Sequence, residues 1–177
     1  MGEATTRIVL SVTGSDRPGL TSALAEAVLA AGGNWQEGHL SRLGGLYVGS
    51  VLVELPDANV GELQRQVQAI DAAGLNVVIN PAGSEPAPPS GVLLFELIGQ
   101  DRPGIIREVS AILARLGVNI ESLSSGEETG AWGGERLFRA QVRVTLPGGI
   151  EPEAVQEALE EISGEIMVDF SFAKAGG

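Results

Sequence analysis

The sequence predicts an α+β protein made of two successive β-α-β-β-α-β units, each a four-stranded antiparallel sheet with two helices on one face. Three observations support this: a repeated motif, helical spacing of apolar residues after it, and strand-like apolar segments around each helix. The first unit is expected at residues 1–81, a proline-rich linker at 82–91, and the second unit at 92–177.

The repeated motif relates the two halves when the chain is shifted by 85 residues. Residues 14–19 read Gly-Ser-Asp-Arg-Pro-Gly, and residues 99–104 read Gly-Gln-Asp-Arg-Pro-Gly. Residues 32–34, Gly-Gly-Asn, likewise coincide with residues 117–119, Gly-Val-Asn. So many identities in one register indicate an internal duplication.

A helix is expected between the two parts of each motif, because apolar residues there recur along one helix face. The face is formed by Leu20, Leu24, Val28 and Ala31 in the first copy, and by Ile105, Val109, Leu113 and Leu116 in the second. The short apolar runs at 8–12 and 92–98 predict a buried strand ahead of each helix.

The other elements follow in the same order in both copies. Further strands are expected at 35–40, 46–55 and 75–79 in the first copy, and at 120–123, 137–146 and 165–170 in the second. A second helix follows the proline that ends each third strand. Its apolar face is formed by Val60, Leu63, Val67 and Ile70, or by Val155, Leu159 and Ile162. This order is that of the ferredoxin-like fold.

The second copy has six more residues than the first between its motif asparagine and the following proline. We place them in residues 124–135 and expect a longer, mobile loop there. Trp132 in this loop could anchor a partner or simply be exposed. His39 is expected on a strand surface, although its ability to titrate near neutrality would also suit a ligand contact.

The composition argues against several classes of protein. Without cysteine, and with His39 as the single histidine, the chain has no thiol nucleophile, no cysteine-rich zinc site and no metal site with two imidazoles. A net charge of −12 argues against direct contact with nucleic acid. With neither a leader nor an apolar run of about 20 residues, we expect a cytoplasmic protein without membrane contact. No metal or cofactor is expected.

The motif itself has chemistry that suits an α-amino acid. Asp-Arg-Pro-Gly between a strand and a helix would leave helix N–H groups available to a carboxylate. Asp16 and Asp101 could hold an ammonium group, and Asn34 and Asn119 add amides that both donate and accept. In the simpler interpretation, the aspartate caps the helix, the glycine makes the turn, and the asparagine ends the helix in a left-handed conformation. Both interpretations stay open.

The tandem Gly-x-Asp-Arg-Pro-Gly and Gly-x-Asn motifs resemble the ACT domain, a small regulatory module that binds amino acids. The resemblance covers residues 7–81 and 92–172, and two copies alone look most like the glycine cleavage system transcriptional repressor group. In this family the ligand typically lies where two domains meet. The resemblance therefore implies a ligand site formed by Asp16, Gly19, Leu20, Asn34, Asp101, Gly104, Ile105 and Asn119.

The resemblance implies a non-catalytic regulator that binds a small amino acid, for example glycine or serine, at ACT–ACT interfaces and controls a protein partner such as a transcription factor. One alternative is a detached regulatory subunit of an amino-acid metabolic enzyme. Another is a ligand-free dimerisation module, since edge strands can pair; a homodimer is one expected assembly. An enzyme is disfavoured, because Asp16, Asp101 and His39 show no recognisable catalytic spacing.

Overall fold

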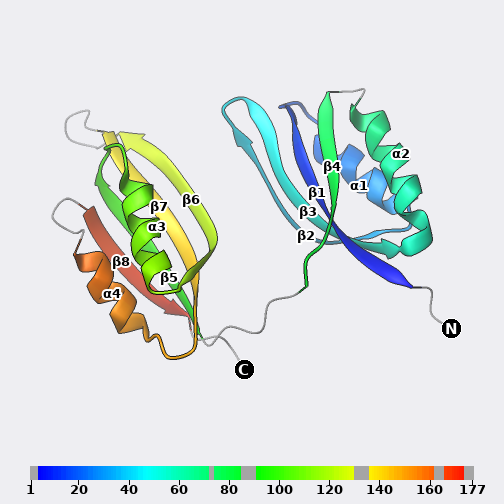
Figure 1. Cartoon of the computed structure of the whole chain (residues 1–177). Helices are drawn as coiled ribbons and strands as arrows, with labels where there is room; N and C mark the ends of the chain where they lie inside the picture. Colours follow the sequence, from blue (N-terminus) through cyan, green and yellow to red (C-terminus); the bar gives the residue numbers. More distant parts are fainter. Residues whose placement is uncertain (1–3, 72–73, 85–90, 130–135, 162–165, 174–177) are drawn as a thin grey trace. The chain divides into compact units, whose positions relative to one another are not determined.

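A computed structural model shows the chain as two compact units, residues 1–85 and 86–177, called unit 1 and unit 2 below (Figure 1). The structure describes residues 4–71, 74–84, 91–129, 136–161 and 166–173. Of the linker predicted at 82–91, residues 85–90 lie outside the described residues. No helix in the described ranges is long and apolar enough to span a bilayer.

Unit 1 is a four-stranded antiparallel sheet in the order β2-β3-β1-β4, with its helices on one face (Figure 1). Its elements are β1 (Thr5–Ser15), α1 (Leu20–Ala30), β2 (Asn34–Leu43), β3 (Leu46–Pro56), a 3-10 turn η1 (Asp57–Asn59), α2 (Val60–Asp71) and β4 (Leu75–Pro81). Strand β1 lies between β3 and β4, so β2 and β4 form the two edges.

Unit 2 repeats this arrangement with the sheet order β6-β7-β5-β8. Its elements are β5 (Gly91–Gln100), α3 (Ile105–Arg115), β6 (Asn119–Thr129), β7 (Arg136–Leu146), α4 (Pro152–Glu160) and β8 (Ile166–Ala173). The predicted fold class is therefore confirmed, with the helices and strands in the expected order.

Each unit has a hydrophobic core of its own, formed between the sheet and its helices. In unit 1, Leu10, Leu24 and Leu63 are fully buried, from β1, α1 and α2 respectively. In unit 2, Leu113 of α3 and Leu159 of α4 are fully buried against β5 and β7. Burying a leucine side chain contributes about 1.5–3 kcal/mol, so these side chains hold the helices on the sheet. All but one of the eight helix-face residues predicted in α1 and α3 are buried; Leu116 is half-buried.

The prediction of a mobile loop at 124–135 is wrong for its first half. Strand β6 continues to Thr129, and its register pairs Ser124 with Gln141 and Thr129 with Arg136. Side chains from Glu121 to Thr129 are exposed on both faces of this edge strand, so no alternation of apolar and polar residues marks it. Residues 130–135, including Trp132, lie outside the described residues.

Gly14, the first residue of the motif, lies where β1 pairs with the start of β4. A Cβ atom added at Gly14 would lie 2.5 Å from the carbonyl oxygen of Gly74 and 2.9 Å from the Cα atom of Leu75. Both are backbone atoms, so no side-chain rotation can make room for the added carbon. A close approach of the two backbones therefore explains this glycine.

We expect Gly14→Ala to lower the free energy of unfolding by about 1–3 kcal/mol, the usual cost of overpacking. Gly61→Ala is the matched control, because an added Cβ atom there has no neighbour within 4 Å. Position 61 is in the first turn of α2, where alanine should leave stability unchanged or slightly higher. Urea unfolding measures both variants. If Gly14→Ala were as stable as the wild-type protein, the start of β4 would be able to move away from β1 to make room for the added Cβ atom, and the close approach would not be required.

Candidate functional site

The β1–α1 loop of unit 1, residues 16–19, joins the end of the central strand to the first helix. Gly19 has φ 90°, the left-handed conformation that glycine adopts without steric cost. Its carbonyl oxygen accepts a hydrogen bond from the Ala23 N–H at 2.9 Å, which closes the first helical turn. No side chain among the described residues caps α1. The first N–H groups of α1 are therefore left for solvent or a ligand.

The β5–α3 loop of unit 2, residues 101–104, has the same geometry. Gly104 has φ 98°, and its carbonyl oxygen accepts a hydrogen bond from the Glu108 N–H at 3.0 Å. The first helical residues, Leu20 and Ile105, are only 3% and 2% exposed. Their side chains belong to the cores, so these two predicted ligand residues can contact a ligand only through their backbone.

Asp16 ties the loop of unit 1 to the β2–β3 hairpin. Its Oδ2 lies 3.0 Å from Nε of Arg42 on β2, and its N–H donates to the Gly45 carbonyl at 3.5 Å. In unit 2 the Asp101 N–H donates to the carbonyl of Arg136 at 3.0 Å. Asp16 therefore acts as an ion-pair partner and not as the helix cap of the simpler interpretation. Arg42 has no signal in the sequence as a site residue, because only the strand register brings it to Asp16.

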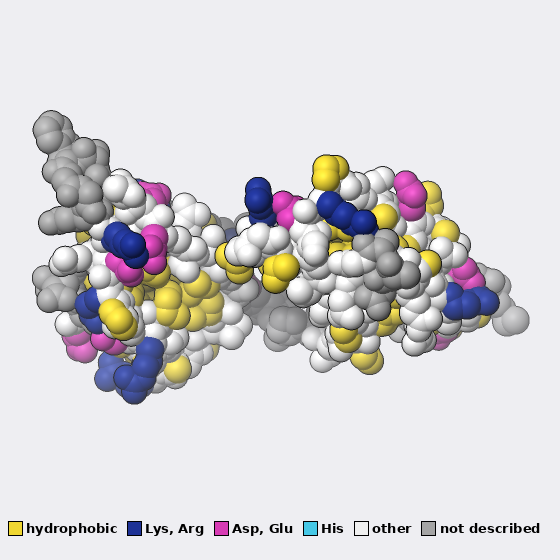
Figure 2. All heavy atoms as spheres, turned by 90° about the horizontal axis from the view of Figure 1, so that it is seen from above, with side chains coloured by type: hydrophobic (Ala, Val, Ile, Leu, Met, Phe, Trp, Pro, Cys, Tyr) yellow, Lys and Arg dark blue, Asp and Glu magenta, His cyan; other side chains and the backbone are white. Residues whose placement is uncertain are grey.

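The motif arginines of the two units have different surroundings. In unit 2, Nη1 and Nη2 of Arg102 donate to the two carboxylate oxygens of Glu108 at 2.9 and 2.6 Å. These hydrogen bonds hold the pKa of Glu108 below its usual range. Ala23 takes the place of Glu108 in unit 1, so Arg17 lacks that carboxylate. Figure 2 shows basic side chains beside acidic ones at several places on the surface.

Asn34 lies at the opposite end of the sheet from Asp16. It is the first residue of β2 and pairs with Glu54, which pairs in turn with Arg7 on β1. Ser15, the neighbour of Asp16, is eight residues further along β1. At about 3.3 Å per residue the two ends are roughly 26 Å apart. One small ligand cannot touch Asp16 and Asn34 of the same unit.

Unit 2 separates its predicted residues in the same way. Asn119 pairs with Thr145, which pairs with Val92 near the start of β5, whereas Asp101 follows the end of β5. Neither asparagine ends a helix in a left-handed conformation. Gly32, with φ 70°, and Gly117, with φ 67°, do so instead. Each unit therefore brings together the loop residues only, and leaves its exposed asparagine at the far end.

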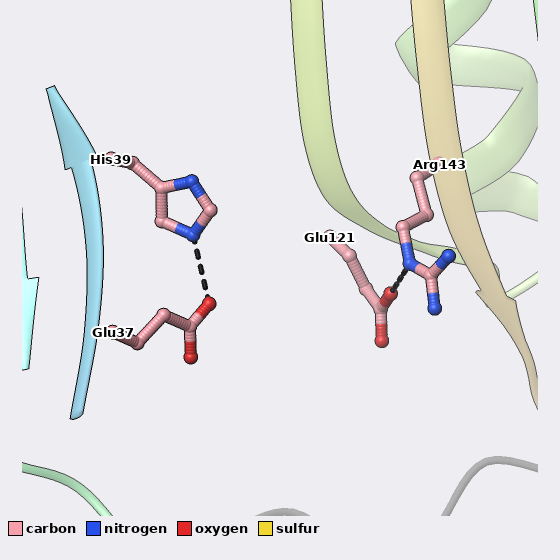
Figure 3. A network of polar contacts seen from close by, with 4 residues as sticks. All are labelled: Glu37, His39, Glu121 and Arg143. Carbon is pink, nitrogen blue, oxygen red and sulfur yellow. Dashed lines mark hydrogen bonds and ion pairs between the residues drawn. The ribbon is translucent and has the colours of Figure 1, made fainter.

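His39 lies on the exposed surface of β2, as expected. Its side chain is 75% exposed, and its Nε2 lies 2.8 Å from Oε1 of Glu37 (Figure 3). A similar surface pair in unit 2 joins Nε of Arg143 to Oε2 of Glu121 at 2.7 Å (Figure 3). Exposed pairs of this kind contribute about 0–1 kcal/mol to stability, so neither pair holds its unit together.

Each half of the chain matches a known protein domain. Residues 6–79 and residues 94–164 each match a family model described as an ACT domain. A comparison with curated protein sequences gave no match.

Two crystal structures are similar over nearly the whole chain. An unknown protein from Galdieria sulphuraria shares 27% identity at a TM-score of 0.80, over 96% of this chain and 99% of that one. A protein suggested to be a glycine cleavage system transcriptional repressor shares 16% identity at a TM-score of 0.71, over 96% and 98%. At 16% identity, the similarity to this second structure shows a shared fold and not a shared role. Since each half matches a family model for the ACT domain, the chain belongs to the ACT domain family and carries two ACT domains in tandem.

Proposed function

We propose that this protein is a non-catalytic regulator. It binds a small amino acid, such as glycine or serine, at an interface between ACT domains and so controls a protein partner such as a transcription factor. The main support is the uncapped helix start behind a left-handed glycine, which occurs in both units. ACT domains are typically regulatory modules that bind amino acids, and one structural neighbour has a suggested role as a repressor.

The 26 Å separation within one unit supports a site shared by two ACT domains. Strand β2 is an edge strand, so one side of its backbone can pair with another strand. In an antiparallel pair of such edges, the Asn34 end of one strand lies beside the Arg42 end of the other. Because Arg42 contacts Asp16, this pairing would bring the asparagine of one domain to the loop of another.

A zwitterionic amino acid fits such a shared site. Its carboxylate would accept hydrogen bonds from the backbone N–H groups at the start of α1, beginning with that of Leu20. Its ammonium group would donate to the Asp16 carboxylate or to the amide oxygen of the asparagine from the second domain. Ligand binding would then favour the paired arrangement of the domains, and a partner that prefers another arrangement would be released.

We expect glycine or serine, within a panel of amino acids, to raise the Tm of the full-length protein. A ligand at 100 times its Kd stabilises the folded state by about 2.7 kcal/mol, which corresponds to a shift of several degrees. The shift should be lost in Asp16→Ala/Asp101→Ala, because the ammonium loses its acceptor. It should persist in Glu157→Ala, a control on the exposed face of α4.

The absence of any shift in the wild-type protein would contradict the proposal and favour the ligand-free dimerisation module. If an amino acid raises the Tm but the protein co-purifies with a metabolic enzyme and not with a transcription factor, the result would favour the detached regulatory subunit.

We also expect Asn34→Ala to weaken binding about as much as Asp16→Ala, although the two residues lie at opposite ends of the sheet. The loss of one hydrogen bond to a charged group corresponds to roughly tenfold or more in Kd. Asn76→Ala is the matched control, an exposed asparagine on the other edge strand, β4. Isothermal titration calorimetry measures each Kd. Equal binding by Asn34→Ala and Asn76→Ala would exclude a shared site that uses β2.

A further inference from the structure

The two units carry different charges around loops of the same geometry. Near the loop, a residue of unit 1 corresponds to the residue 85 positions later in unit 2. On the hairpin, where unit 2 has extra residues, corresponding residues are those with the same place in the strand register. The register places Arg42 opposite Tyr47, which pairs with Gly14, and it places Glu127 opposite Phe138, which pairs with Gly99. The hairpin residue that faces the loop is therefore basic in unit 1 and acidic in unit 2.

The five equivalent positions differ in net charge. In unit 1 they are occupied by Asp16, Arg17, Ala23, Arg42 and Gly45. In unit 2 they are occupied by Asp101, Arg102, Glu108, Glu127 and Arg136. Two positive charges exceed one negative charge in the first set, whereas three negative charges exceed two positive charges in the second.

The ion pairs show where this difference lies relative to the motif aspartates. In unit 1 Arg42 lies 3.0 Å from the carboxylate of Asp16 and offsets its charge beside the loop. In unit 2 the corresponding position holds a carboxylate instead, that of Glu127, which lies 3.6 Å from Nη1 of Arg136. Both guanidinium Nη atoms of Arg102 are engaged by Glu108. A guanidinium group therefore lies beside the motif aspartate of unit 1, whereas a carboxylate occupies the corresponding hairpin position of unit 2.

We propose that Arg42 and its counterpart Glu127 decide which unit takes the amino acid, so that the loop of unit 1 binds the ligand carboxylate and the loop of unit 2 does not. This inference rests on the proposed function, because it assigns the ligand to one of the two loops. Charges of the same sign placed close together in a partly dehydrated contact oppose binding, and opposite charges favour it. The protein therefore binds one amino acid per chain.

Titration calorimetry of the full-length protein with glycine and with serine, at low salt, tests the assignment. We expect one ligand per chain. Arg42→Glu, which copies unit 2, should weaken binding by about tenfold or more, with a smaller loss in Arg42→Gln. Arg65→Glu is the matched control, the same charge change at an exposed site on α2, and should bind as the wild type does. Thermal unfolding without ligand checks that each variant is folded.

The reverse change tests the same charges in unit 2. Glu108→Ala/Glu127→Arg gives unit 2 the residues that unit 1 has at Ala23 and Arg42, and should raise the stoichiometry from one ligand per chain to two. Three results would overturn this inference while leaving the proposed function in place. They are two ligands bound per wild-type chain, one ligand bound per chain in the Glu108→Ala/Glu127→Arg variant, and an unchanged Kd in a folded Arg42→Glu variant. Failure of the wild-type protein to bind any amino acid would overturn the proposed function, and with it the assignment.

Discussion

Burial of one face of each central strand is the constraint on which both units depend. Strand β1 pairs with β3 on one side and with β4 on the other, and Leu10 is fully buried beneath the helices. Because side chains alternate along a strand, a slip of one residue would turn the apolar row of β1 away from the helices. The register therefore determines that β1 ends at Ser15 and that the loop leaves the sheet beside the β2–β3 hairpin. Strand β5 has the same role in unit 2.

The fold could be predicted because its strongest signals are local. Leu20, Leu24 and Val28 follow a helical period and are all buried in the core of unit 1. The pairing of Asp16 with Arg42 has no such signal, since it depends on where β2 lies against β3 and β1. The extension of β6 to Thr129 has no signal in the sequence for a related reason: both faces of this edge strand are exposed there, so its side chains carry no periodic pattern.

The motif does not itself indicate how far apart its two parts lie in one unit. Asp16 and Asn34 belong to one repeated motif, and their chemistry suggests one site. Helix α1, of 11 residues, lies between them and is about 16 Å long. Together with the loops at its two ends, it carries the chain from one end of the sheet to the other. The loop residues Asp16, Gly19 and the backbone of Leu20 do lie together. Sequence alone could therefore identify the loop residues that lie together, and only the strand register shows that Asn34 of the same unit lies at the other end of the sheet.

The duplication allows the two units to differ in charge while they keep one fold. Substitutions on an exposed surface cost little stability, whereas those in the core are expensive. Thr21 and Tyr47 share a hydrogen bond of 2.5 Å beside the loop of unit 1, and Ile106 and Phe138 occupy these positions in unit 2. The fold therefore accepts an exposed polar pair or a partly buried apolar pair at these positions. Charges beside the loop are freer still, and it is there, where stability constrains the sequence least, that two units of the same fold can acquire different binding properties.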